Sequence, residues 1–114
     1  MKKALVKKEE DLTPMELLQL GKSVWDDESK ENNFKAIGHL EKSIELNQEI
    51  STAYAVLSEV YLNDIRREYN QVPDALRKAK EASKRSLQLN PNSALAWIEK
   101  TYITYYEKDF TAFE

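Results

Sequence analysis

The sequence predicts an all-α protein of about five helices, arranged as antiparallel pairs of helix, turn and helix. Composition is the first observation behind this prediction, because the 114 residues include only 2 Gly and 3 Pro, and no run has the character of a strand. The second is a phrase that occurs at 43–54 and again at 86–97. In each copy an amphipathic helix is expected to end at Leu-Asn, a short polar turn follows, and a new helix begins. Such self-similarity indicates stacked helical units, each of which needs a neighbour to cover its apolar face.

Size and charge indicate one domain and exclude several classes of function. Residues 1–12 are charged and aperiodic, which predicts a flexible lead-in to a helical domain over 13–114. The formal net charge of −3 offers no large positive field for nucleic acid. The basic start is followed by too few apolar residues for a signal peptide, and no apolar run is long enough to span a bilayer. Since the chain also lacks Cys, we expect a soluble protein of the cytoplasm.

Start and stop signals define the first two helices. Thr13 is the expected N-cap, with Pro14 in the first turn and Glu16 placed for a capping box. The apolar residues that follow are Leu17, Leu18, Leu20, Val24 and Trp25. The polar run 26–33 interrupts this pattern and predicts a loop. A second helix is expected to end near Asn47, and its apolar residues are Phe34, Ile37, Leu40 and Ile44.

Three further helices are predicted in the second half of the chain. Ser51 or Thr52 is expected to begin the third, and the residues up to about Tyr69 are compatible with its continuation. Its apolar face consists of Tyr54, Leu57, Val60, Tyr61 and Ile65. Pro73 is expected to start the fourth, whose small and apolar residues are Leu76, Ala79, Ala82, Ser83 and Leu87. The fifth is expected to begin at Ala94 and to carry Trp97, Ile98, Tyr102, Tyr105 and Tyr106.

These helix pairs resemble tetratricopeptide repeats, which are helix pairs of about 34 residues. In the first pair the matching residues are Leu17, Leu20, Gly21, Val24, Ala36, Leu40, Ser43 and Gln48. In the second pair they are Tyr54, Leu57, Ser58, Tyr61, Ala79, Ser83, Ser86 and Pro91. A third, incomplete unit begins with Trp97 and Thr101, and extra residues lengthen the first two units. The resemblance implies a short right-handed superhelix, and it extends loosely to the repeat segments of bacterial signalling regulators.

Small residues are expected where the paired helices approach most closely, because a larger side chain would push the helix axes apart. These residues are Gly21, Ser43, Ser58, Ala79 and Ser86. Larger side chains, namely Leu17, Tyr54 and Trp97, are expected to fill the gaps between pairs.

The resemblance also implies a concave groove lined by one face of the first helix of each unit. The first unit would supply Met15, Leu18, Lys22, Trp25 and Asp26, and the second Thr52, Ala55, Glu59, Leu62 and Asn63. The third unit would supply Leu95, Ile98, Tyr102, Tyr105 and Tyr106. Many of these residues are apolar or aromatic, which is typical of a partner site. We therefore predict a partner-binding set of Met15, Leu18, Trp25, Leu62, Leu95, Ile98, Tyr102, Tyr105 and Tyr106.

One known binding mode of these repeats is not expected. Some of them clamp a C-terminal carboxylate with Lys, Asn and Arg at fixed positions. The residues that this chain has at those positions are Leu18, Lys22, Val56, Leu95 and Glu99. The mismatches and the opposing charge exclude that clamp.

The fifth predicted helix is apolar on almost every side. One stripe consists of Leu95, Ile98, Tyr102 and Tyr105, and another of Ile103, Tyr106, Phe110 and Phe113. Trp97, Thr101 and Thr104 are expected to face the preceding pair. Such a helix needs cover on more than one side. Either residues 110–113 fold back as a partial sixth helix, or a second chain or a partner helix supplies the cover.

Residues for catalysis or metal binding are missing or isolated. His39 is the one histidine and the chain has no Cys, so His-based triads and zinc sites lack parts. The two glycines stand alone on predicted helices, which excludes a phosphate-binding loop. The acidic run 26–28 lacks the turn and spacing of a calcium loop, and the basic residues of 78–85 are expected to form a solvated face. We predict no enzyme, no cofactor and no metal.

These observations together predict a protein-protein interaction module. It would bind a partner helix or peptide, or a second copy of itself through the C-terminal helix, in an apolar and aromatic groove. One alternative is a sensory or regulatory repeat module of a larger signal-transduction protein. Another is a helical bundle that encloses a small apolar ligand. Nucleic acid and membranes are not expected as partners.

Overall fold

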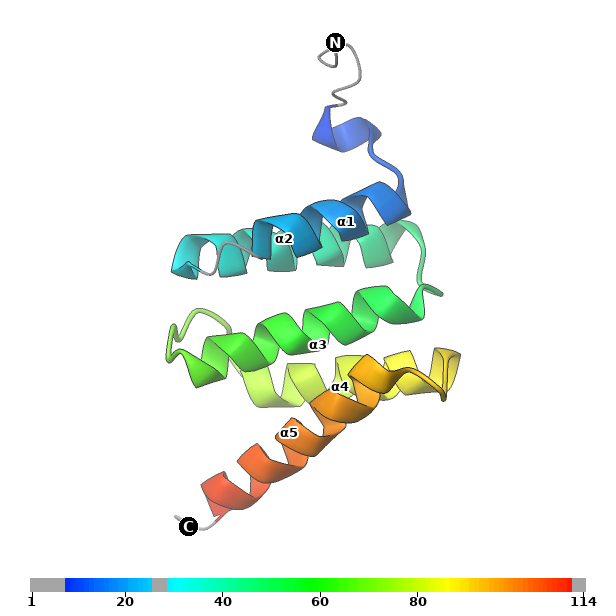
Figure 1. Cartoon of the computed structure of the whole chain (residues 1–114). Coiled ribbons are helices and arrows are strands. Elements are labelled where there is room, and N and C mark those ends of the chain that lie inside the picture. The colour runs from blue at the N-terminus through cyan, green and yellow to red at the C-terminus, as the bar shows by residue number, and fades with distance from the viewer. Residues whose placement is uncertain (1–7, 26–28, 112–114) are drawn as a thin grey trace.

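The protein, described by a computed structural model over residues 8–25 and 29–111, is all-α in these ranges (Figure 1). Its elements are the short 3-10 helix η2 (Glu9–Asp11) and the helices α1 (Pro14–Trp25), α2 (Lys30–Leu46), α3 (Ser51–Arg66), α4 (Ala75–Leu89) and α5 (Ala94–Thr111). Of the lead-in predicted over 1–12, residues 1–7 lie outside the described ranges. No helix in the described part of the chain is long and apolar enough to cross a membrane.

The helices form a stack of antiparallel pairs. α1 packs along α2, α3 packs along α4, and α2 joins the two pairs through its contacts with α3. α5 lies against both α4 and α3 and crosses the end of the stack obliquely, as Figure 1 shows. α1, α3 and α5 lie on one side of the stack, and α2 and α4 on the other. The predicted fold class, an all-α stack of about five helices, is confirmed.

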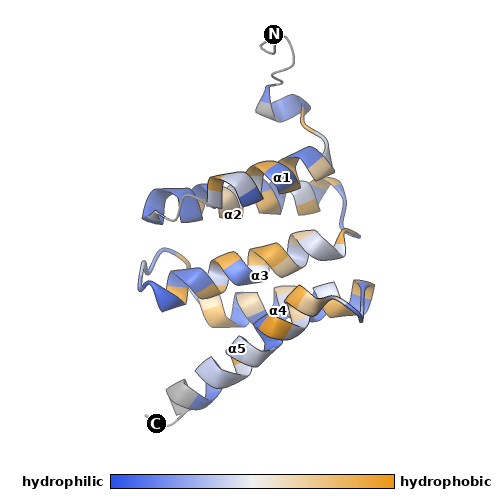
Figure 2. Ribbon diagram, in the orientation of Figure 1, coloured by the Kyte–Doolittle hydropathy of each residue, from blue (hydrophilic) through white to orange (hydrophobic). Residues whose placement is uncertain are grey.

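The hydrophobic core lies between the pairs and is centred on α3. Figure 2 shows hydrophobic residues concentrated along α3 and in the N-terminal half of α5. Among the buried side chains are Leu40 of α2, Val60 of α3 and Ile103 of α5. All four other α-helices contact α3, so the central helix is covered by its neighbours, as a stacked repeat requires.

Side-chain caps fix the starts of the first two helices. At α1, the Glu16 backbone N–H donates to the Thr13 hydroxyl over 3.1 Å, and the Thr13 N–H donates to the Glu16 carboxylate over 2.9 Å, so the predicted capping box is present. At α2, the Asn32 N–H donates to the Ser29 hydroxyl over 3.0 Å. α2 consequently begins at Lys30, and the loop predicted over 26–33 is wrong for its last four residues. The first turn of α2 contains only polar residues, so apolar periodicity does not reveal where the helix starts. The local signal for this start is the N-cap Ser29.

The connection between α3 and α4 is longer than predicted. α3 ends at Arg66 instead of about Tyr69, and α4 begins at Ala75 instead of Pro73. Three residues of the connection, Glu68, Asn70 and Asp74, have φ between 54° and 58° and cannot continue a right-handed helix. The buried carboxylate of Asp64 holds this loop, since it accepts hydrogen bonds from the backbone N–H groups of Gln71 and Val72 over 3.1 and 3.4 Å. The residues after Arg66 that were predicted to continue α3 therefore belong to a loop, which is held by hydrogen bonds to the buried Asp64 carboxylate.

Small residues occupy the helix crossings, as predicted. Three serine hydroxyls donate across a crossing to a backbone carbonyl: Ser43 to Pro14, Ser58 to Ala79, and Ser86 to Ser51, over 2.8 to 2.9 Å. Each such hydrogen bond contributes about 1 kcal/mol to stability, and each serine is small enough to let the backbones approach. A fourth bond of this kind, from the Ser83 hydroxyl to the Ala96 carbonyl over 3.1 Å, attaches α5 to α4.

The two glycines make a matched pair for testing this close packing. A Cβ atom at Gly21 would lie 2.9 Å from Cγ of the fully buried Leu40, whereas a Cβ at Gly38 would meet nothing within 4 Å. Gly38→Ala should therefore raise the free energy of unfolding by about 0.5–1 kcal/mol through helix propensity. Gly21→Ala should lower it by about 1 kcal/mol, because displacing Leu40 outweighs the same gain. Urea denaturation of both variants measures the difference, and equal effects would contradict the close contact.

The face that α5 buries differs from the predicted one. Ala96, Glu99 and Ile103 are buried. Trp97, Thr101 and Thr104, which were predicted to face the preceding pair, are exposed, and two of them, Trp97 and Thr104, line a hollow between α4 and α5. The Ser83–Ala96 contact sets this rotation, because only a small residue fits at that crossing. α5 continues as one helix to Thr111, so residues 110 and 111 do not start a sixth helix. Residues 112–114 lie outside the described ranges.

Candidate functional site

A groove of about 390 Å³ lies between α1, α3 and α5, and we call it the α1–α3–α5 groove. Its lining combines apolar and aromatic side chains with a lysine and two glutamates: Lys22, Trp25, Val56, Glu59, Leu95, Ile98, Glu99 and Tyr102. Ile98 and Tyr102 are 50% and 43% exposed. Large apolar side chains that remain exposed in a concave surface are typical of a binding site.

The structure brings four of the nine predicted partner-binding residues together in this groove, namely Trp25, Leu95, Ile98 and Tyr102. Leu18 and Leu62 are 1% and 0% exposed and belong to the core, which corrects their placement on the surface. Leu18 lies on α1 and Leu62 on α3, and α3 contacts both α1 and α5. Both leucines therefore belong to the core and cannot contact a partner in this structure.

The other three predicted residues lie outside the groove lining. Met15 is exposed in the first turn of α1. Tyr105 is also exposed, and its ring packs edge-on against that of Tyr106, with 5.6 Å between the ring centroids. Tyr106 lines a different hollow together with Ile65 and Leu76. Of the predicted groove positions, Asp26 lies outside the described residues.

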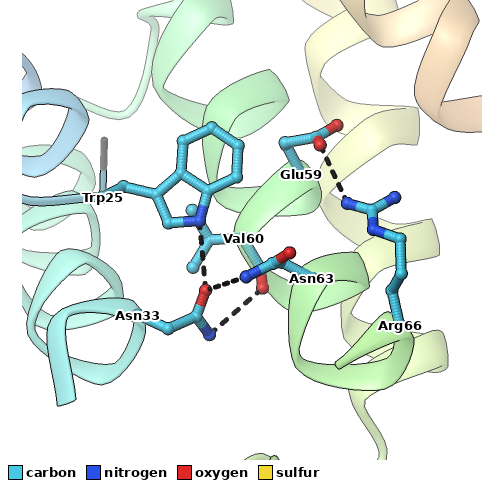
Figure 3. A network of polar contacts seen from close by, with 6 residues as sticks. All are labelled: Trp25, Asn33, Glu59, Val60, Asn63 and Arg66. Atoms are coloured by element: carbon cyan, nitrogen blue, oxygen red, sulfur yellow. Dashed lines mark hydrogen bonds and ion pairs between the residues drawn. The ribbon is translucent and has the colours of Figure 1, made fainter. Parts of the chain in front are cut away.

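A buried polar network positions Trp25 at the edge of the groove (Figure 3). The indole Nε1–H donates to Oδ1 of Asn33 over 3.1 Å, and the side-chain amide of Asn63 donates to the same oxygen over 2.9 Å. The Asn33 amide in turn donates to the backbone carbonyl of Val60 over 3.4 Å. Asn33 is buried and thus joins α1, α2 and α3 at one point. Sequence reasoning missed this residue because it was expected in a loop; its signal is a polar residue four positions before Ile37 on the buried face of α2.

An ion pair within α3 lies beside the groove, and its arginine also contacts an aromatic ring of α5. The guanidinium of Arg66 lies 3.1 Å from the Glu59 carboxylate, as drawn in Figure 3, and 5.8 Å from the ring centroid of Tyr102. Both the carboxylate and the aromatic ring face attract a guanidinium. Arg66 thereby holds Tyr102 and Glu59 on the same side of the groove.

Glu99 is the most unusual residue of the groove. It is 0% exposed, and neither carboxyl oxygen accepts a hydrogen bond from an N–H or hydroxyl group of the described residues. Burial, followed by a hydrogen bond to Glu59 and then the charge of Glu59, raises the pKa of Glu99 to about 9, against a smaller opposite effect of Arg66. Glu99 therefore carries a proton at neutral pH. The sequence contains a signal for it, since Glu99 follows Ala96 and precedes Ile103 at the spacing of one helix face.

Other hollows on the described residues are larger than this groove, and two of them show how they differ from it. One of about 940 Å³ lies beside the α3–α4 loop and is lined by charged side chains such as Arg66, Glu68 and Arg77. The other, of about 570 Å³, lies between α4 and α5 and includes Lys84 and Trp97. Neither contains a buried polar atom that lacks a partner. The α1–α3–α5 groove is set apart by its fully buried Glu99 carboxyl.

Comparisons with known proteins leave the class of this protein to be defined by its own structure. No family model, no curated protein and no solved structure matches the chain. Its fold and groove define an all-α protein of stacked antiparallel helix pairs with a concave, largely apolar site. No three His, Asp or Glu side chains of the described ranges are grouped in a way that could hold a metal ion.

Proposed function

We propose that the protein is an interaction module that binds a helix or peptide of a partner protein in the α1–α3–α5 groove. The observation that carries this proposal is the convergence of Trp25, Ile98 and Tyr102, from two helices, on one open concavity. Two of these side chains keep about half of their surface exposed. Aromatic and apolar side chains of this kind supply most of the binding energy of protein interfaces.

The groove suits an extended or helical segment because its walls are helices that are fixed to one another. Trp25 is held by Asn33, and Tyr102 lies against Arg66. Side chains that are already ordered lose little entropy when a partner binds, so a preorganised groove gains affinity. An amphipathic helix would place apolar residues three and four positions apart along such walls.

Selection from a phage-displayed library of random peptides on the immobilised protein tests this proposal. We expect a selected peptide to lose at least tenfold in affinity for Ile98→Ser and for Tyr102→Ser, because truncating a central aromatic or aliphatic contact commonly costs about 2 kcal/mol. Tyr105→Ser is the matched control, since Tyr105 is exposed on the same helix but does not line the groove. Fluorescence titration gives the affinities, and circular dichroism confirms that all three variants fold.

Two outcomes of this experiment contradict the proposal. One is a set of peptides whose affinity is unchanged in both groove variants. The other is a loss in the control variant that equals the loss in the groove variants, because binding would then lie on another face of α5. Sedimentation of the protein alone at two concentrations tests the remaining possibility that a second copy occupies the groove.

A further inference from the structure

We propose that the partner segment carries a basic side chain, arginine or lysine, whose cationic group binds the Glu99 carboxyl in the α1–α3–α5 groove. This inference rests on the proposed function and specifies the chemistry of the partner. Two observations carry it: the fully buried carboxyl accepts no hydrogen bond from an N–H or hydroxyl group of the described residues, and it is one of two glutamates that line the groove.

Arg66, whose charge acts on Glu99, is already paired with Glu59. The charged groups around Glu99 are Glu59 and Arg66 of α3, which pair with each other over 3.1 Å, and Lys22 of α1, which is exposed to solvent. On its own helix, Lys100 lies 5.2 Å from the ring centroid of Trp97 and so faces away from the groove. An ionised carboxylate that is buried without a hydrogen-bond donor is unfavourable, and a cation or donor that reaches it is correspondingly favoured.

Two residues that line the groove, Glu59 and Tyr102, already contact a guanidinium. The guanidinium of Arg66 lies 3.1 Å from the Glu59 carboxylate and 5.8 Å from the ring centroid of Tyr102. An incoming basic side chain would find the same kinds of group, with the ring of Tyr102 and the indole of Trp25 for its charge and the apolar side chains Val56, Leu95 and Ile98 for its methylene stem. Because Glu99 is covered, binding requires a rotation of Glu99 or of the half-exposed Ile98 and Tyr102.

Binding of a cation should release a proton. Glu99 is protonated in the free protein at neutral pH, since burial and Glu59 raise its pKa to about 9. A salt bridge forms only with the ionised carboxylate, so the proton of Glu99 passes to solvent when the cation binds. Affinity for a basic peptide should therefore rise by up to about tenfold per pH unit as pH increases toward 9.

The test uses peptides selected from the random library on the native protein and on Glu99→Gln. We expect the native protein to select peptides with Arg or Lys at one shared position, and Glu99→Gln not to do so. For one selected peptide, replacing that residue with norleucine should weaken binding at least tenfold to the native protein but little to Glu99→Gln. Titration calorimetry in phosphate and in Tris should show release of about one proton with the native protein only.

Gln resembles a protonated Glu in shape, so Glu99→Gln is expected to fold, and Glu45→Gln on the exposed face of α2 is the control for altered net charge. Peptides that depend on Ile98 and Tyr102 but share no basic residue, or that bind without releasing a proton, would overturn this inference and leave the proposed function standing. Peptides that depend on neither Ile98 nor Tyr102 would instead overturn the proposed function.

Discussion

Glu99→Leu should stabilise the protein, and the gain should grow with pH between about 4.5 and 9. In the folded state the pKa of Glu99 is raised to about 9, while its ordinary value is 4.5. Between these values the folded state binds more protons than the unfolded state, so the free energy of unfolding falls as pH rises. The decrease amounts to at most about 1.4 kcal/mol per pH unit, or on the order of 3 kcal/mol by pH 7. Leucine removes this loss and also the buried carboxyl.

Urea denaturation at several pH values between 5 and 9 measures this effect. The difference in free energy of unfolding between Glu99→Leu and the native protein should increase with pH, because subtraction cancels the titration of groups that do not interact with Glu99. Glu99→Gln should show a similar pH dependence of the difference with a smaller gain, since a polar amide remains buried. Glu45→Gln, on the exposed face of α2, is the control for a change in net charge. A difference that stays constant from pH 5 to 9 would show that Glu99 is ionised in the folded protein.

The pH dependence of stability that Glu99 causes is connected to binding if a partner occupies the groove as proposed. A buried acid that weakens the fold at neutral pH is retained at the expense of stability, and residues of this kind concentrate at binding and catalytic sites. A partner that pairs with Glu99 would restore the lost stability by mass action. We therefore expect the melting temperature at pH 8 to rise more than at pH 5 when the selected basic peptide is added.

The sequence predicted the helices well because their signals are local. The capping box of Thr13 and Glu16 forms as expected, and the serines of the repeated phrase lie at helix crossings. The predicted starts of α2 and α4 were wrong because no clear local signal marks them. Polar residues before Phe34 hid the start of α2, and a loop held by the buried Asp64 replaced the start that Pro73 suggests. Long-range contacts of a polar side chain leave no periodic signal in the sequence.

The candidate site was predicted in part. Register within the repeat placed Trp25, Ile98 and Tyr102 on one surface, and they do line one groove. The same register placed Leu18 and Leu62 on that surface, although both are buried. Register gives the direction of a side chain from its helix, but the distance between α1, α3 and α5 decides whether it remains exposed. That distance depends on how α5 crosses the stack, which the short repeat does not specify.

Asn33→Ala should be among the most destabilising substitutions at a polar position of this protein. Asn33 Oδ1 accepts hydrogen bonds from both Trp25 and Asn63, and its amide donates to the Val60 carbonyl. Alanine leaves two donors without their acceptor in a buried site, which costs about 2–4 kcal/mol in free energy of unfolding. The neighbouring Phe34→Ala is the control, because Phe34 is largely exposed and its truncation should cost less than about 1 kcal/mol.

A double-mutant cycle separates this network from simple loss of packing. In Asn33→Ala the Asn63 amide is left unsatisfied, whereas Asn63→Ala leaves the bond between Trp25 and Asn33 in place. The two substitutions together should therefore destabilise the protein by about 1–2 kcal/mol less than the sum of their separate effects. Additive effects would indicate that the two amides do not share an acceptor.

The same cycle also connects the network to binding. Trp25 loses its hydrogen bond in Asn33→Ala but keeps it in Asn63→Ala. Affinity for a selected peptide should therefore fall more in Asn33→Ala than in Asn63→Ala, at a temperature where both variants are fully folded. If both variants bind as the native protein does, Trp25 contributes no ordered surface to the groove. A weaker affinity in Asn33→Ala would show that the buried Asn33 orders Trp25 for binding, although Asn33 itself does not line the groove.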